Sequence, residues 1–108
     1  MFGAYGIKEV DVDFLHSRKD DILLIDVRTE AEVSAGAIAG AIHIPLHLLP
    51  LKAHEIPQDK PVVIYCRSGA RSAQACAFMQ QKGYDNMHNL SGGIAAWARA
   101  GKPIGQLS

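Results

Sequence analysis

The sequence predicts an α/β fold, a three-layer α/β/α sandwich built around a mainly parallel sheet. Its short apolar runs are rich in β-branched residues and do not alternate with polar ones, which indicates strands buried on both faces. Segments long enough to form helices separate these runs, and such connections imply parallel strands with helices on either side. With 108 residues and no internal repeat, the chain has the length of one domain, so we treat residues 1–108 as a single domain.

Four segments have the length and composition of strands: residues 22–27 (ILLIDV), 41–44 (AIHI), 62–65 (VVIY) and 87–90 (MHNL). A shorter candidate lies near residues 5–7. Strand and helix segments therefore alternate along the chain, as a parallel sheet requires.

Polar caps and glycines mark the helix boundaries. Asp11 is suited to cap a helix that ends near Arg18, and Thr29 and Glu32 have the spacing of a capping box. A longer helix is predicted over residues 72–82. Three glycines stand where a left-handed residue commonly ends a helix: Gly36, Gly83 and Gly101.

Two stretches carry weaker signals. Residues 46–57 present an apolar helical face that Pro50 interrupts, so their structure stays open between helix and loop. The tail from about residue 102, which contains Pro103 and Gly105, is predicted to have little order.

The charge balance argues against several partners. The 11 basic and 11 acidic side chains cancel, so no global field favours nucleic acid or an anionic membrane. The N-terminus lacks the pattern of a signal peptide, and no apolar run approaches the roughly 18 residues that a membrane helix needs. We expect a soluble cytoplasmic protein with no nucleic-acid or membrane partner.

The two cysteines, Cys66 and Cys76, predict neither a disulfide framework nor a zinc site, because no CxxC or His/Cys ligand spacing is present. Cys76 is predicted to face the core from the helix over residues 72–82. Trp97 and Met87 are also expected in the core. Isolated histidines are usually structural, so we expect no metal at the three in the middle of the chain, His43, His47 and His54.

Cys66 stands where a predicted strand gives way to a predicted helix, which is where open α/β sheets place their active sites. A cysteine is a useful nucleophile only as a thiolate, and an unperturbed cysteine is mostly thiol at neutral pH. The loop over residues 66–71 (CRSGAR) has three means of favouring the anion: converging backbone N–H groups, the start of the helix near Ser72, and two arginines.

The same loop is suited to hold an anionic substrate against the sulfur. Its small residues Ser68, Gly69 and Ala70 let the backbone curl, and Gly69 can adopt a positive φ. Arg67 and Arg71 present planar guanidinium groups that match sulfonate, carboxylate or phosphate oxygens. Arg67 fits a solvated loop charge as well as it fits substrate contact. Arg71, which closes the loop, is therefore the stronger candidate for substrate contact.

Four motifs in order resemble the rhodanese (sulfurtransferase) family over nearly the whole chain. They are Asp26-Val27-Arg28, the stretch 36–45 (GAIAGAIHIP), the loop 66–71, and the stretch 89–103 (NLSGGIAAWARAGKP). The resemblance implies a five-stranded parallel sheet and a ping-pong reaction in which Cys66 becomes a persulfide. Asp26 and Arg28 are expected to brace the floor of the loop rather than to do chemistry, with Ser72 in a further supporting role.

Loop length argues against a phosphatase or arsenate reductase. The rhodanese-fold phosphatases use a C-x5-R loop, one residue longer, that encircles a tetrahedral phosphate. Here the C-x4-R loop ends at Arg71, and Ser72 occupies the position where such a phosphatase needs arginine. The shorter ring is expected to suit a sulfane sulfur.

The sequence therefore predicts a thiosulfate-type sulfurtransferase that needs no cofactor or metal. Cys66 is the expected nucleophile; its small anionic donor would bind at Arg67, Ser68, Gly69, Ala70 and Arg71, and the sulfur would pass to cyanide or a thiol. The alternative from another class is a non-enzymatic persulfide carrier or docking module that serves a protein sulfur acceptor.

Overall fold

The computed structural model describes residues 6–107. The strands are β1 (Lys8–Val10), β2 (Leu23–Asp26), β3 (Ile42–His43), β4 (Val62–Tyr65) and β5 (Met87–Leu90). The helices are α1 (Val12–Arg18), α2 (Glu30–Ser34), α3 (Leu49–Lys52), α4 (Ala70–Gln81) and α5 (Gly93–Arg99), with 3-10 turns η2 (Lys19–Asp21), η3 (Leu46–Leu48) and η4 (Ala53–Glu55).

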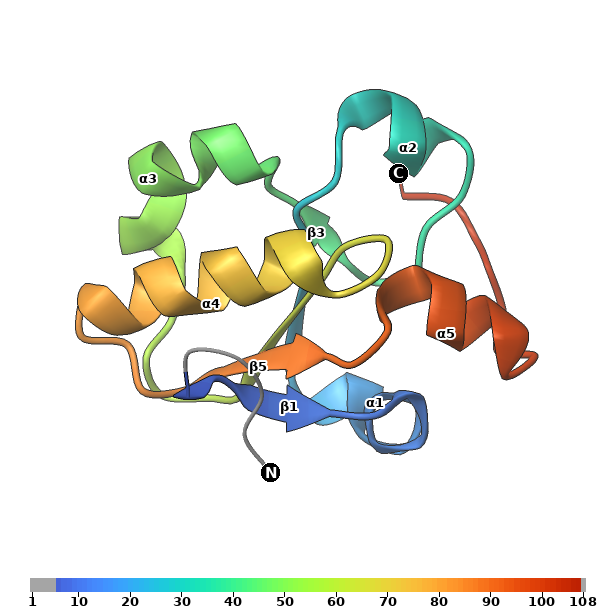
Figure 1. Cartoon of the computed structure of the whole chain (residues 1–108), viewed down its shortest axis with the longest axis horizontal. Helices are drawn as coiled ribbons and strands as arrows, with labels where there is room; N and C mark the ends of the chain where they lie inside the picture. Colours follow the sequence, from blue (N-terminus) through green and yellow to red (C-terminus); the bar gives the residue numbers. More distant parts are fainter. Residues whose placement is uncertain (1–5, 108) are drawn as a thin grey trace.

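The strands form one five-stranded sheet in the order β1-β5-β4-β2-β3, with every neighbouring pair parallel. In the central strand β4, Ile64 pairs with Ile25 of β2 on one side and with Asn89 of β5 on the other. Helices lie on both faces of this sheet (Figure 1). The predicted α/β/α sandwich with a parallel five-stranded sheet is therefore confirmed.

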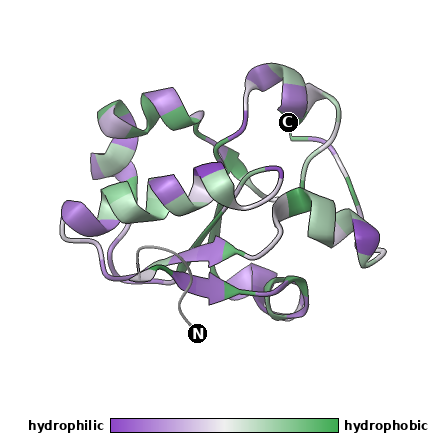
Figure 2. Cartoon of the chain, viewed as in Figure 1, coloured by the Kyte–Doolittle hydropathy of each residue, from purple (hydrophilic) through white to green (hydrophobic). Residues whose placement is uncertain are grey.

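The two faces of β4 contribute to two separate hydrophobic clusters. Val62 and Ile64 pack on the face covered by α3 and α4, whereas Val63 and Tyr65 pack on the face covered by α1 and α5. The predicted core residues are confirmed, since Met87 is fully buried in the first cluster and Trp97 in the second. Along α4, hydrophilic residues are mixed with hydrophobic ones (Figure 2), and its buried Ala75, Cys76 and Met79 belong to the first cluster.

The predicted strands over residues 62–65 and 87–90 are found with those bounds, and those over 22–27 and 41–44 are shorter in the structure. The prediction near residues 5–7 is wrong for residues 6–7, because the strand starts at Lys8; residue 5 lies outside the described residues. This edge strand reads KEV and is only partly buried, so it lacks the apolar run that marks a central strand.

The predicted helix boundaries are largely confirmed. Asp11 accepts a hydrogen bond from the Phe14 N–H at 2.8 Å, and Thr29 and Glu32 form a complete capping box at the start of α2. The glycines after the helices adopt positive φ, namely Gly36, Gly83 and Gly101. The helix predicted over residues 72–82 begins earlier, at Ala70, so Arg71 and Ser72 belong to its first turn.

Residues 46–57 form η3, α3 and η4 in succession, which resolves the ambiguity at this stretch. Pro50 lies in the first turn of α3, where its missing N–H leaves no helical hydrogen bond unmade. The end of the described chain contacts the domain: Pro103 accepts a hydrogen bond from Trp97 Nε1 at 2.8 Å, and Gly105 forms a bridge with Ala37. In residues 6–107, no helix combines the length and the apolar character needed to cross a membrane.

Candidate active site

The carboxyl ends of three neighbouring strands meet at one edge of the sheet. Asp26 ends β2, Cys66 directly follows β4, and Asn89 lies near the end of β5. Parallel strands bring residues distant in sequence together at this edge, which is the usual place for a site in such a fold. The loop from Cys66 to the start of α4 lies there between α2 and α5 (Figure 1).

The start of α5 determines how the loop backbone is turned. Ile94 N–H donates to the Cys66 carbonyl at 2.9 Å, and Ala95 N–H donates to the Arg67 carbonyl at 3.0 Å. Gly93 adopts a φ of 61°, and a Cβ there would lie 2.5 Å from both carbonyl oxygens. Only glycine permits this close approach. These two bonds turn both carbonyls toward α5 and fix the backbone at the start of the loop.

The Cys66 sulfur receives several hydrogen bonds although the residue is buried. Gly69 N–H donates to Sγ at 3.1 Å, and Ser72 Oγ lies 3.3 Å from Sγ. Burial alone would raise the pKa of the Cys66 thiol, but hydrogen bonds from the Ser72 hydroxyl and from the amides of Ser72, Gly69 and Ser68 together lower it below its usual value. The environment of Cys66 therefore favours the thiolate over the thiol.

Asn89 holds the loop from the side of β5. Its Nδ2 donates to the Gly69 carbonyl at 3.1 Å and to Glu9 Oε2 at 3.0 Å, and its Oδ1 accepts from Ser72 Oγ. Gly69 has a φ of 107°, which confirms the predicted positive value. The single Ser72 proton can serve either Asn89 Oδ1 or the sulfur, but not both at once. Asn89 stands in one of the quoted motifs, yet its role was missed, because only the fold brings it to the loop.

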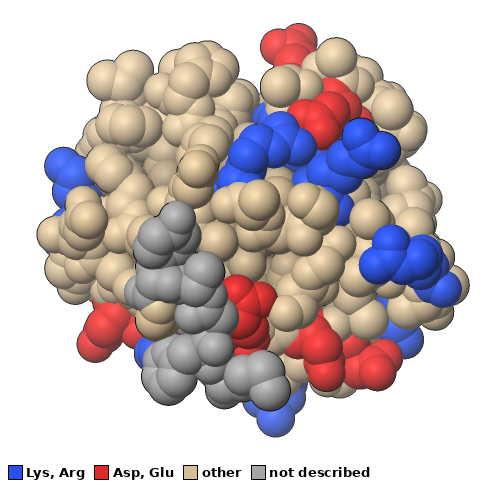
Figure 3. All heavy atoms as spheres, in the orientation of Figure 1, with Lys and Arg blue, Asp and Glu red and all other residues tan. Residues whose placement is uncertain are grey.

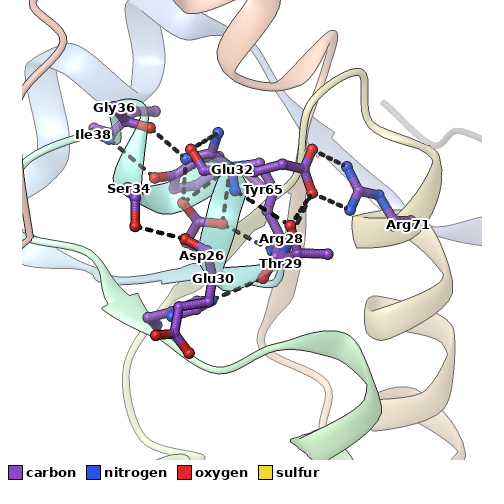
Figure 4. Close-up of polar contacts among 11 residues, drawn as sticks. Asp26, Arg28, Thr29, Glu30, Glu32, Ser34, Gly36, Ile38, Tyr65 and Arg71 are labelled. Atoms are coloured by element: carbon purple, nitrogen blue, oxygen red, sulfur yellow. Dashed lines mark hydrogen bonds and ion pairs between the residues drawn. The ribbon is translucent and has the colours of Figure 1, made fainter.

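Asp26 and Arg28 form a buried ion pair at 2.7 Å. Arg28 also donates to the Gly36 carbonyl at 2.7 Å and to the Glu32 carbonyl at 3.4 Å, and its guanidinium lies over the Tyr65 ring (Figure 4). These bonds fix α2 and the turn after it to the end of β2. The pair also lies beside the start of the loop, because Asp26 is the strand partner of Tyr65, the residue directly before Cys66.

Arg71 points from α4 toward α2, where Glu32 holds it. Its Nη1 and Nη2 donate to the two Glu32 carboxylate oxygens at 2.7 and 2.8 Å (Figure 4). This contact, with help from Thr29, lowers the pKa of Glu32 to about 2 and raises the pKa of Arg71. Sequence reasoning assigned Glu32 to the capping box alone, because the ion pair joins residues that are distant in the chain.

Arg67 is exposed, and with Arg28 and Glu32 it lines a cavity of about 340 Å³ whose apolar wall comes from α5 and Ile104. Arg71 lines a neighbouring cavity of about 480 Å³ with Leu46 and residues around it. A third, of about 370 Å³, borders Ser68, Gly69 and Ala70 together with Glu9, Asn89 and Gln74. Basic and acidic side chains lie next to one another in the region of α2, and others are spread along the opposite, lower edge of the same view (Figure 3). Each of these three cavities borders a part of the loop, and Cys66 lines none of the three.

The other chemistry-bearing residues lie apart from the loop. Cys76 is fully buried, and burial together with the Glu9 charge raises its pKa to about 12. His43 Nε2 hydrogen-bonds the Arg28 carbonyl at 2.7 Å. Among residues 6–107, no three His, Cys, Asp or Glu side chains are grouped as metal ligands would be.

The family model for the rhodanese-like domain matches residues 11–100 of the chain. A protein of Allochromatium vinosum named "Sulfurtransferase" is 52% identical over 101 residues, which cover 91% of this chain and 94% of that protein. The "Putative sulfurtransferase YtwF" of Bacillus subtilis is 36% identical over 100 residues, covering 90% of this chain and 96% of that protein.

A solved structure is similar over almost the same span. The crystal structure of a rhodanese-related protein from Thermoplasma volcanium superposes with a TM-score of 0.85 at 32% identity, covering 91% of this chain and 97% of that one. The match in sequence and in fold extends beyond the cysteine loop to the whole sheet and its helices. The chain belongs to the rhodanese-like domain family, and its named relatives support sulfur transfer as its general activity.

Proposed function

We propose that the protein transfers a sulfane sulfur from thiosulfate or a similar anionic donor to cyanide or a thiol through a persulfide on Cys66. The observation that carries the proposal is the sulfur itself, buried at the end of the central strand, surrounded by hydrogen-bond donors and with a lowered pKa. Such a site favours a thiolate, and a thiolate is the form of cysteine that attacks sulfur.

In the first half-reaction the Cys66 thiolate attacks the outer sulfur of thiosulfate. The new bond joins Sγ to that sulfur, the S–S bond of thiosulfate breaks, and sulfite leaves with the electron pair, so that Cys66 carries a persulfide anion. In the second half-reaction cyanide attacks the outer sulfur, thiocyanate leaves, and the Cys66 thiolate returns. Neither step needs an external oxidant, a metal or a cofactor.

The loop residues have distinct proposed roles in this cycle. The amides of Ser68, Gly69 and Ser72 would stabilise the negative charge on Sγ and on the persulfide, since they already donate to the sulfur. Arg67 would meet the oxygens of the donor, which is supported by its exposure and its position on the cavity wall. Arg71 would join Arg67 at the donor once Arg71 leaves Glu32. The small side chain of Ala70 would leave space for the donor at the start of α4.

The position of Ser72 argues against a phosphatase activity. This residue is fully buried in the first turn of α4 and bonds to Asn89 and to the sulfur. The place where the longer phosphatase loop has its arginine is therefore occupied by part of the core. A ring of the phosphatase kind would require the start of α4 to change.

The test is to isolate the persulfide. After incubation with thiosulfate and removal of the excess, the intact mass should increase by one sulfur atom, located at Cys66 and missing in Cys66→Ser. Cyanide should then discharge it as thiocyanate. A persulfide carrier would load but discharge slowly to cyanide and quickly to a protein acceptor, and a docking module would not load. Failure to load from thiosulfate, mercaptopyruvate and a protein persulfide alike would contradict sulfur transfer at this site.

A further inference from the structure

Arg71 is occupied by a carboxylate of its own chain. Glu32 binds it through both oxygens at 2.7 and 2.8 Å, a planar two-point contact (Figure 4). An arginine holds two oxygens of a sulfonate with the same geometry. Glu32 thus takes the edge of the guanidinium that the oxygens of an anionic donor would need.

The ion pair is accessible to an incoming ligand. The Arg71 side chain is 35% exposed and the Glu32 side chain 29%. Glu32 lines the cavity that contains Arg67, and Arg71 lines the neighbouring one, so the pair stands between the two openings. Partly exposed ion pairs are weak, which means that a donor is able to displace Glu32 at a measurable cost.

Glu32 also sets the net charge at this place. The charge of Arg28 is offset by Asp26, its buried partner. Arg67 and Arg71 remain as two positive charges, and two carboxylates oppose them: Glu32, which binds Arg71, and Glu30, which lines the Arg71 cavity. The attraction for an anion at the site therefore depends on whether Glu32 stays ionised and in place.

We propose that Glu32 is a specificity-determining residue that selects against doubly charged sulfur donors by competing with them for Arg71. This inference rests on the proposed sulfur transfer at Cys66 and adds the charge class of the donor. A donor with one negative charge needs only one guanidinium partner and meets less repulsion from the carboxylate. It therefore loses less affinity through Glu32 than a dianion does.

Two small donors isolate the effect of charge. Thiosulfate is a dianion that gives up its outer sulfur with sulfite as the leaving group. Methanethiosulfonate is a monoanion that gives up the equivalent sulfur with methanesulfinate as the leaving group. In both cases the Cys66 thiolate forms the new S–S bond, the old S–S bond breaks, and the leaving anion takes the electron pair, so the same persulfide results.

Glu32→Gln is the decisive variant, because glutamine keeps the capping box and removes the charge. We expect kcat/KM for thiosulfate to rise about two- to fivefold relative to that for methanethiosulfonate, mostly through a lower KM, since a partly exposed ion pair is of that strength. The matched control is Ser34→Ala, which removes an α2 hydroxyl that donates to the Glu30 carbonyl at 3.0 Å and leaves the Glu32 carboxylate on Arg71. It should leave the ratio of the two donors unchanged.

An unchanged ratio in Glu32→Gln would overturn the proposal while leaving sulfur transfer intact. An equal change in Ser34→Ala would overturn it too, because the effect would then come from the position of α2. A change in kcat alone, with KM constant, would likewise contradict competition for the donor. If the wild-type protein forms no Cys66 persulfide from any donor, the proposed function itself fails, which the mass measurement shows separately.

Discussion

The two cysteines belong to the same hydrophobic cluster, yet their environments act in opposite directions. Cys66 is 1% exposed and Cys76 is 0% exposed, so accessibility does not separate them. The pKa of Cys66 lies below its usual value, whereas the pKa of Cys76 is raised to about 12. Burial acts to raise the pKa of both thiols. At Cys66 the hydrogen bonds from the loop amides and Ser72 outweigh burial, whereas at Cys76 the Glu9 charge adds to it. Burial alone therefore does not make a cysteine inert.

The largest expected effect comes from substituting each of the two cysteines separately. Cys66→Ser should abolish thiosulfate:cyanide transfer, because a hydroxyl is not ionised at neutral pH and forms no persulfide. Cys76→Ala should retain transfer and lose about 1 kcal/mol of unfolding free energy through the small cavity it leaves. Steady-state rates and urea unfolding of both variants check this. Equal loss of transfer in the two variants would end the distinction between the cysteines.

A methyl group at Gly93 should disturb the donors around Cys66 from outside the loop. In Gly93→Ala the Cβ would lie 2.5 Å from the carbonyl oxygens of Cys66 and Arg67, so the loop must shift. We expect a loss of about 100-fold in kcat/KM, typical of a displacement of about 1 Å at a reactive group. The Cys66 pKa should rise toward the ordinary cysteine value.

Gly101→Ala is the matched control for this substitution. Gly101 also has a positive φ, of 76°, but an added Cβ there meets nothing within 4 Å. It should lose stability through backbone strain, of about 1 to 3 kcal/mol, and keep its activity. If both variants lose activity to the same degree, close packing at Gly93 is not what holds the loop.

Ser72→Ala should have a smaller effect, because it removes one donor and leaves the loop amides. We expect about a tenfold loss in kcat/KM, corresponding to about 1.5 kcal/mol for one hydrogen bond to a charged group. The Cys66 pKa should rise, since the Ser72 hydroxyl favours the anion most among its hydrogen-bond partners. Ser17→Ala on α1, whose hydroxyl donates to the Phe14 carbonyl at 3.0 Å, is the control and should not change the rate. An unaltered pH profile in Ser72→Ala would show that the Ser72 hydroxyl does not lower the pKa of Cys66.

The smallest effect concerns stability in acid. The Glu32 pKa is about 2 in the folded protein against an ordinary value of 4.5. The folded state thus favours the ionised form, so the stabilisation is present above about pH 4.5 and is lost as the pH falls toward 2. The difference in unfolding free energy between wild type and Glu32→Gln should shrink over this range. A constant difference from neutral pH down to acid would show that the pair with Arg71 adds nothing through charge.

Local sequence signals predicted most of the fold. The runs over residues 62–65 and 87–90 are buried strands, and each carries enough apolar side chains to be recognised without its neighbours. The predicted position of the edge strand β1 was too early in the sequence, because the charged residues of β1 resemble a loop. Residues 46–57 stayed ambiguous since Pro50 is compatible with the first turn of a helix as well as with an interruption.

Within the candidate site, the sequence predicted the parts that depend on local order. Cys66 at the strand end and Gly69 at positive φ follow from the loop itself. The sequence did not predict that Glu32 would bind Arg71, or that Asn89 would link Ser72 to Gly69. These contacts join segments between 17 and 39 residues apart, and only the packing of α2 and β5 beside α4 creates them.

The proposed function depends most directly on the ionisation of Cys66, and Cys76 is the reference thiol in the same molecule. Alkylation by iodoacetamide at a series of pH values, with each cysteine quantified by peptide mass spectrometry, measures both at once. We expect the Cys66 rate to reach its plateau at a pH below the pKa of an ordinary cysteine, and Cys76 to stay unmodified until the protein unfolds. A Cys66 midpoint at the value of a free cysteine, or modification of both sulfurs in parallel, would contradict the claim that the loop creates an activated thiolate.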